Sequence, residues 1–147
     1  MPMSACCSSR SAPCACYRVN GQLVASSAQG IEIGIREAYP NCPKFIQRRK
    51  LLDMGTRDAL AAPVTRGTLL EGAVADLVRQ ADTLFVASVH PERGADASHR
   101  GGRPGFVTMR DAATLRIPDY QGNSMFNTLG NFSVDPHALS ICIPDFA

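Results

Sequence analysis

Short segments of strand character recur along the chain, and only one segment carries a strong helical period. Residues 30–38 alternate Ile31, Ile33 and Ile35 with polar residues, as a half-buried strand does. Residues 83–89 (TLFVASV) form an apolar run of strand length. The other predicted strands are a hairpin over 17–26 that turns at Asn20-Gly21, and residues 106–109, 114–117 and 138–143. Because strands and helices do not alternate regularly, the order favours an α+β fold, mainly β with helices, as a decorated β-barrel.

The clearest helical signal follows residue 68. Apolar residues there recur at the spacing of a buried helical stripe, namely Leu70, Ala73, Val74, Leu77 and Val78. Thr68-Leu69-Leu70-Glu71 also has the form of a capping box, which marks a helix start. We therefore predict a helix over about 68–81, and two shorter helices at 44–50 and 123–132.

The composition is that of a single globular domain, with 147 residues of which 45% are hydrophobic and 19% charged. We find neither an apolar run of the ~20 residues that a membrane helix needs nor a signal-peptide core, so we expect a cytoplasmic protein with reduced thiols. Four of the six cysteines crowd the first sixteen residues with C-C and C-x-C spacing. Zinc sites favour C-x2-C spacing, so we expect an atypical or disordered start over 1–14, no metal site, and a domain over 15–147.

Charge is unevenly distributed along the chain. Residues 1–50 hold seven basic and two acidic side chains, whereas the remainder holds eight and eleven. Thirteen of the fifteen basic residues are arginine, whose planar fork suits phosphate and carboxylate groups. A nucleic-acid site would need a basic stripe with interleaved aromatic residues, and only residues 44–50 come near to one. We therefore do not expect a nucleic-acid partner.

Residues 90–105 (HPERGADASHRGGRPG) carry the most informative polar groups. Their glycines predict a long loop, and Ser98, His99 and Arg100 offer a hydroxyl, an imidazole and a guanidinium side by side. Glycines at 101 and 102 free the backbone to approach a ligand. These are the parts of a phosphate cradle, and the alternative is a mobile, solvated loop.

Residues 118–131 (PDYQGNSMFNTLGN) form a second candidate stretch. Asn123, Asn127 and Asn131 recur at four-residue spacing although asparagine is a weak helix former, which suggests a polar ligand or neighbouring backbone as their partner. A helix starting near Gly122-Asn123 would present free N–H groups to a phosphate. The apolar side chains between them, Met125, Phe126 and Leu129, are expected in the core.

Both stretches resemble a known family. The run ADTLFVASVHPERGADASHRGGRPGFV, followed by PDYQGNSMFNTLGN, by Asp135-Pro136 and by a final apolar strand ending in DF, resembles a bacterial branch of the pyridoxamine 5′-phosphate oxidase-like family. NCPKFIQRR and RVNG, earlier in the chain, are similar to segments of the same branch. The resemblance covers roughly residues 18–146, and its most specific motifs are DASHRGG and GNSMFNTLGN.

The resemblance implies an FMN-binding split β-barrel, usually a homodimer, that acts as a flavin-dependent oxidoreductase. The substrate and electron donor stay open, as does the choice between FMN and the F420 deazaflavin or haem that other split barrels bind. The chain departs from the family pattern because it looks truncated at both ends and lacks the Arg-x-x-x-x-Lys strand pattern. A non-catalytic flavin-binding or dimerisation module and an inactive remnant are therefore the alternatives.

The resemblance also implies which residues hold the flavin. One set of residues from each motif would bind its phosphate. In the first motif these are Ser98, Arg100 and the backbone of Gly101. In the second motif they are Asn123, Ser124 and Asn127. Phe106 and Val107 would lie on a strand under the isoalloxazine ring, and Tyr120 would face the ring or the ribityl chain.

Two further side chains are candidates for chemistry. His99 titrates near neutral pH and is the candidate proton donor, although a histidine more often serves as a hydrogen-bonding partner of backbone. Cys42 lies close to Lys44 in sequence, which suits a reactive thiol, and the alternative is a buried structural cysteine.

Overall fold

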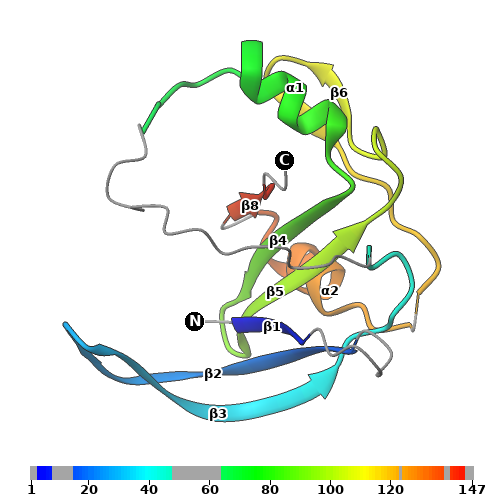
Figure 1. Cartoon of the computed structure of the whole chain (residues 1–147). Coiled ribbons are helices and arrows are strands. Elements are labelled where there is room, and N and C mark those ends of the chain that lie inside the picture. The colour runs from blue at the N-terminus through cyan, green and yellow to red at the C-terminus, as the bar shows by residue number, and fades with distance from the viewer. Residues whose placement is uncertain (1–2, 8–14, 48–63, 123, 138–139, 145–147) are drawn as a thin grey trace.

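A computed structural model describes residues 3–7, 15–47, 64–122, 124–137 and 140–144, and within these ranges the chain folds into three small β-sheets and two helices (Figure 1). This strand-rich composition confirms the predicted α+β class. The strands of the described part do not close into a barrel. Neither of its helices is long and apolar enough to cross a membrane.

The first sheet has the order β1–β2–β3, formed by β1 (Met3–Cys7), β2 (Ala15–Ser27) and β3 (Gly30–Pro40). Strands β2 and β3 make a long antiparallel ribbon whose turn lies between Ser27 and Gly30. The predicted turn at Asn20-Gly21 is therefore wrong. These residues lie inside β2 at a bulge, where a Cβ on Gly21 would collide with the carbonyl oxygen of Gly34. The glycine serves close strand approach and not a hairpin turn.

The strand predicted at 30–38 is confirmed, but its predicted half-burial is wrong. Ile31 and Ile35 are exposed on β3, and Leu23 and Val24 are exposed on β2. The free end of the ribbon projects from the rest of the described chain, so nothing described there covers these side chains (Figure 1). Period-2 alternation identified the strand correctly, but the expected cover on one face is not provided by the described residues.

The second sheet has the order β5–β4–β8, with β4 (Thr83–His90) between β5 (Gly94–Gly101) and β8 (Ser140–Cys142). The predicted loop over 90–105 is wrong at residues 94–101, which form β5 and pair with β4 along the whole length of the strand. The inward-facing residues of β5 include Asp96 and Ser98, so the buried face of this strand is polar. A search for apolar periodicity misses such a strand.

The core lies between α1 (Gly72–Gln80), β4 and the third sheet, and its buried apolar residues are Val78, Leu84, Val86 and Val107. The helix exists as predicted but begins at Gly72 and not at residue 68. The capping box is wrong because Glu71 is extended and makes no side-chain capping bond. Leu70 instead donates its N–H to the carbonyl of Ala112 at 2.8 Å, which ties this segment to the third sheet.

The third sheet pairs β6 (Thr108–Asp111) with β7 (Thr114–Arg116), close to the predicted strands. Phe106 and Val107 precede β6, so the prediction that they lie on a strand is wrong. The N–H of Phe106 closes a turn onto the carbonyl of Arg103 at 2.9 Å, and Val107 enters the core.

Two further helix predictions need correction. The helix α2 (Asn127–Val134) does not begin near Gly122-Asn123, since Ser124 has a φ of 62°, in the left-handed region. The predicted helix at 44–50 is not formed over its described part, where Phe45 has a φ of 66° and Ile46 closes a turn onto Pro43. Residues 48–50 lie outside the described residues, as do 8–14; residues 3–7, within the predicted atypical start, form β1.

Candidate functional site

A cavity of about 180 Å³ lies where four segments meet: the end of β5, the loop after β3, residues 118–122 and the start of α2. Arg18 and Tyr39 complete its wall. Of the ten residues predicted for the site, eight line this cavity, namely Ser98, His99, Arg100, Gly101, Phe106, Tyr120, Ser124 and Asn127. The structure thus brings together two motifs that are well separated in the sequence.

Of the remaining two predicted residues, one lies in the core and the other is not described. Val107 is 2% exposed in the hydrophobic core and is not among the residues that line the cavity. Asn123 lies outside the described residues. Met125, Phe126 and Leu129 line the cavity and are exposed, so their predicted place in the core is wrong.

The end of β5 supplies the cationic side of the cavity. Arg100 forms an ion pair with Asp119, 2.8 Å from Nη1 to Oδ1, and both side chains are partly exposed. Ser98 is buried on the inner face of the same strand. His99 is half-buried and its ring packs edge-on against Phe85, with the ring centroids 5.5 Å apart. All three residues line one cavity, with Ser98 and His99 on opposite faces of β5.

The glycines after Arg100 allow a close approach of two backbones. A Cβ on Gly101 would collide with the carbonyl oxygen of Phe45. Next to it, the side-chain amide of Gln47 donates to the carbonyl of Gly102 at 2.7 Å. The loop after β3 is therefore clamped onto the end of β5, and Phe45 is held in a left-handed conformation that a bulky residue rarely adopts.

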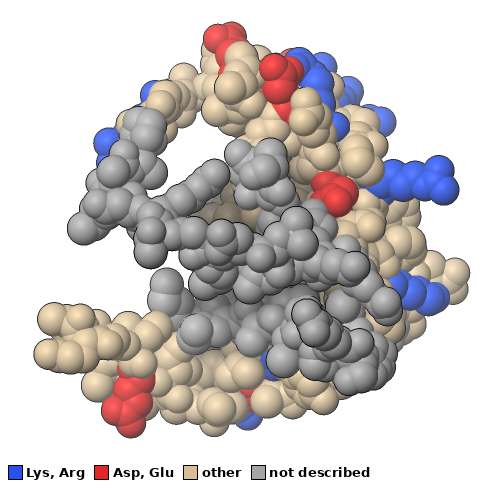
Figure 2. Space-filling model, in the orientation of Figure 1, with Lys and Arg blue, Asp and Glu red and all other residues tan. Residues whose placement is uncertain are grey.

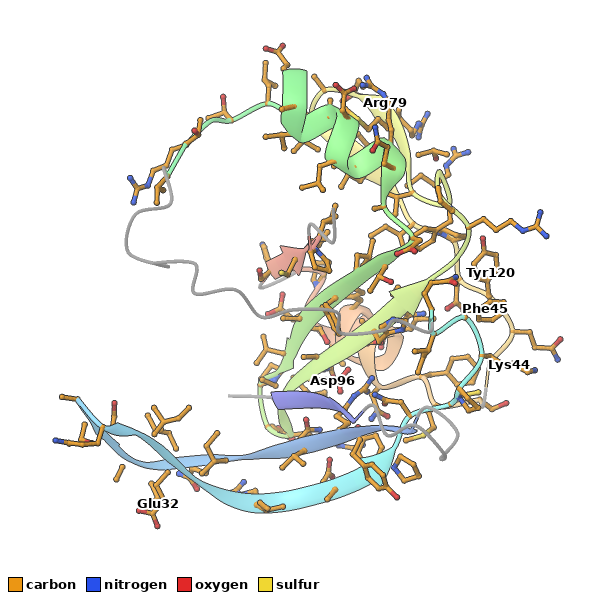
Figure 3. The ribbon with its side chains drawn as sticks, viewed as in Figure 1. Glu32, Lys44, Phe45, Arg79, Asp96 and Tyr120 are labelled. Carbon is orange, nitrogen blue, oxygen red and sulfur yellow. The ribbon has the colours of Figure 1, made fainter. Side chains whose placement is uncertain are left out.

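This clamp brings an aromatic pair to the rim of the cavity. The rings of Phe45 and Tyr120 lie 4.7 Å apart between centroids at an interplanar angle of 34°. Figure 3 shows both rings on one side of the molecule, with Lys44 beside them. Both side chains are exposed, so this edge of the cavity presents flat apolar surface to solvent next to an ammonium group.

A buried polar network forms the floor. Arg18 on β2 pairs with Asp96 on β5 at 2.8 Å, and the other carboxylate oxygen of Asp96 accepts from Thr128 Oγ1 at 3.0 Å. The hydroxyl of Tyr39 accepts from Asn127 Nδ2 at 2.8 Å and from Arg18 Nη1 at 3.4 Å. Because Arg18 is buried in its pair with Asp96, the more exposed cations at the cavity among the described residues are Arg100, itself paired with Asp119, and Lys44.

Several residues of this site were not predicted from the sequence. Tyr39, Phe45 and Asp119 carried no signal of their own as site residues, although Phe45 lies within the NCPKFIQRR segment of the family resemblance. Arg18 and Asp96 lie within RVNG and DASHRGG, but only the fold brings the two together. The similarity of NCPKFIQRR to the family was therefore the signal that could have identified Phe45 as a site residue.

Cys42 also lines the cavity and is a half-buried free thiol. The described residues hold no group of three or more His, Cys, Asp or Glu side chains arranged to bind a metal ion. The prediction that the N-terminal cysteines form no metal site stays a prediction, because their side chains lie outside the described part of the chain.

The site combines a flat aromatic edge, two cations and several hydrogen-bonding side chains. Such a set suits a planar ring that carries an anionic group. Comparisons of the chain with protein-family models, with curated proteins and with solved structures found no match. The resemblance to the pyridoxamine 5′-phosphate oxidase-like family stays a prediction.

Proposed function

We propose that this protein binds FMN in the cavity and is a flavin-dependent oxidoreductase with a split-barrel fold of the pyridoxamine 5′-phosphate oxidase-like family. The observation that carries the proposal is the meeting of DASHRGG and GNSMFNTLGN at one cavity. Residues that the resemblance assigned to one ligand, such as Arg100 and Asn127, line the same cavity, although no spacing rule required it.

The chemistry of the lining residues fits an FMN molecule. Arg100 would hold the phosphate, assisted by Ser98 and Ser124, and the Phe45–Tyr120 edge would face the ring system. The cavity of about 180 Å³ is smaller than the roughly 300–1,000 Å³ typical of small-molecule sites. Binding therefore requires the exposed residues at the rim to move.

When bound, the flavin would supply the electron-transfer chemistry, and the chain would supply binding, orientation and electrostatics. His99 carries the imidazole of the motif, a side chain that commonly serves as a general acid or base, so it is the candidate proton donor. The buried Arg18–Asp96 pair would fix the wall against which the ligand rests.

A reconstitution titration tests the binding proposal. Purified protein is expected to be yellow, or to become so with added FMN, and to release authentic FMN on denaturation. Arg100→Ala is expected to weaken FMN binding by about 1.5–3 kcal/mol, the range for hydrogen bonds to charged groups. Arg79→Ala is the matched control, since Arg79 also forms an ion pair, with Asp76, but lies on α1 away from the cavity (Figure 3). Colourless protein that takes up no FMN would refute the proposal.

The same titration separates the alternative ligands and roles. F420 and haem, added in place of FMN, show whether another cofactor binds more tightly. Bound FMN that neither NADH nor NADPH reduces would favour a non-catalytic flavin-binding module. A poorly cooperative melt without a ligand-induced shift would favour an inactive remnant, because a ligand that binds the folded state raises its stability.

We further infer that two copies associate through the ribbon of β2 and β3. Its free end exposes apolar side chains on both strands, namely Leu23, Val24, Ile31 and Ile35. Uncharged side chains dominate the visible face of this end in Figure 2. Exposed apolar side chains that gather on one part of the surface are typical of an interaction site, and a homodimer is what the family resemblance implies.

Sedimentation velocity tests the association. The wild-type protein is expected to sediment as a dimer, and Ile35→Asp is expected to be monomeric because it places a charge on the apolar ribbon. Val64→Asp is the control, since Val64 is also exposed but lies outside the ribbon. A monomeric wild type, or equal effects of the two substitutions, would contradict the inference.

A further inference from the structure

Residues 118–122 lie along the rim of the cavity and are held there by two side-chain contacts. Asp119 pairs with Arg100 at 2.8 Å, and the ring of Tyr120 lies 4.7 Å from that of Phe45. The two contacts come from neighbouring residues of one segment and reach two different walls. The first contact uses the guanidinium of Arg100, which would bind the phosphate of the proposed ligand, and the second uses the ring of Phe45, which would face its ring system.

The carboxylate of Asp119 occupies a position that an anionic ligand needs. Its Oδ1 lies 2.8 Å from Nη1 of Arg100, whose partly buried guanidinium lines the cavity. The side chain of Asp119 is 49% exposed, so its own loss of hydration in the pair is small and the contact is easily exchanged. A phosphate brings more charge and more acceptor oxygens than a carboxylate, so it can displace Asp119.

The rings of Phe45 and Tyr120 are in direct contact, which leaves no room for a third ring between them. A planar ligand inserted between two rings needs about 7–8 Å between their planes, twice the carbon contact distance. The centroid distance of 4.7 Å is well below this. The ring contact therefore closes one side of a cavity that is itself too small for a nucleotide.

We propose that Asp119 is an internal competitor for Arg100 and thereby lowers the preference of the site for phosphorylated over unphosphorylated ligands. This inference rests on the proposed flavin site. A ligand with a phosphate replaces the carboxylate on Arg100, whereas a ligand with the same ring but no phosphate leaves the Arg100–Asp119 pair intact. Tyr120, next in the chain, is displaced from Phe45 in the same exchange.

The test compares FMN with riboflavin, which has the same ring but lacks the phosphate. Asp119→Asn removes the competing charge, so its affinity for FMN is expected to rise about two- to fivefold, the equivalent of an exposed ion pair, while its affinity for riboflavin stays unchanged. Asp76→Asn, which breaks the exposed Asp76–Arg79 pair on α1, is the matched control and is expected to change neither affinity. In Arg100→Ala, the further substitution Asp119→Asn is expected to give no gain.

Three results would overturn the inference. One is unchanged or weaker FMN binding by Asp119→Asn with an unaltered melting temperature. Another is an equal gain for FMN and riboflavin, which would mean that Asp119 only holds the segment closed. The third is a gain that persists in the Arg100→Ala background, since the competition requires that guanidinium.

A flavin-free measurement separates this inference from the proposed function. Inorganic phosphate is expected to raise the melting temperature of Asp119→Asn more than that of the wild type, because the freed Arg100 binds the anion. If wild-type protein binds no flavin but this difference is present, the proposed function fails and the competition at Arg100 stands. If flavin binds and phosphate stabilises both proteins equally, the competition fails and the proposed function stands.

Discussion

The guanidinium of Arg18 and the carboxylate of Asp96 form a buried ion pair across 78 positions of sequence, 2.8 Å from Nη1 to Oδ1. The two side chains are 9% and 5% exposed. The pair joins β2 to β5, and Asp96 also accepts a hydrogen bond from Thr128 on α2. Three elements around the cavity are thus fixed by one carboxylate.

Asp96→Ala is expected to destabilise the fold by about 3–5 kcal/mol, because it leaves a buried guanidinium without its counter-ion. Denaturant unfolding followed by circular dichroism measures the change. Asp76→Ala breaks an exposed ion pair of similar length, 2.9 Å, and its expected cost is about 0–1 kcal/mol. Similar costs for the two substitutions would show that the buried pair is not the contact that holds the three elements together.

Gly101→Ala is expected to displace the loop after β3, since the added Cβ collides with the carbonyl oxygen of Phe45 and backbone atoms cannot rotate aside. The expected cost is on the order of 1–3 kcal/mol of stability, with a loss of flavin affinity because the Phe45 ring is no longer held at the edge of the cavity. Gly130→Ala is the control, because a Cβ there meets nothing within 4 Å and alanine is the better helix former. A Gly101→Ala variant with unchanged melting and flavin binding would contradict the clamp.

The sequence predicted α1 and β4, whose buried faces are apolar, and missed β5, whose buried face is polar. The stripe ending at Val78 identified α1, and the run at 83–89 identified β4. Strand β5 buries Asp96 and Ser98, so polar residues stand at the positions where a half-buried strand usually has apolar ones. The sequence therefore predicted a loop. Local capping patterns also failed where a long-range bond intervened, as between Leu70 and Ala112.

For the site, the sequence identified motif residues but not their partners. Arg100 and Asn127 were predicted because they belong to the motifs, whereas Asp119 and Tyr39 matter only through the contacts that folding creates. No spacing rule links Phe45 with Tyr120, which lie on separate segments. Such contacts depend on the placement of backbones, and a single sequence carries no direct record of that placement.

Asp135 provides a pH-dependent contact at the end of α2. The backbone N–H of His137 and then its imidazole hydrogen-bond the carboxylate and lower the pKa of Asp135, with the histidine charge adding to the effect and slight desolvation opposing it. A lowered pKa in the folded state means that this contact stabilises the fold above the ordinary pKa of an aspartate and is lost as pH falls through the lowered value. His137→Ala keeps the backbone bond, so an NMR titration is expected to show the Asp135 pKa rising partway toward its ordinary value. An unshifted titration would contradict a contribution from the imidazole.

The hydrogen bond between Asn131 and Ser88 anchors α2 on β4, 3.0 Å from Nδ2 to Oγ. Ser88 is fully buried and Asn131 nearly so, which explains a weak helix former in this position. Asn131→Ala strands the serine hydroxyl and is expected to cost about 1–3 kcal/mol, the desolvation penalty of an unsatisfied buried group.

Adding Ser88→Ala to that variant removes the stranded hydroxyl as well. The double variant is therefore expected to lose less stability than the sum of the two single variants, and denaturant unfolding of all four proteins gives the coupling energy directly. Strict additivity would show that the two side chains do not interact in solution. The helix would then be held on the sheet by its remaining contacts, of which the Thr128–Asp96 bond is the one that also reaches the cavity floor.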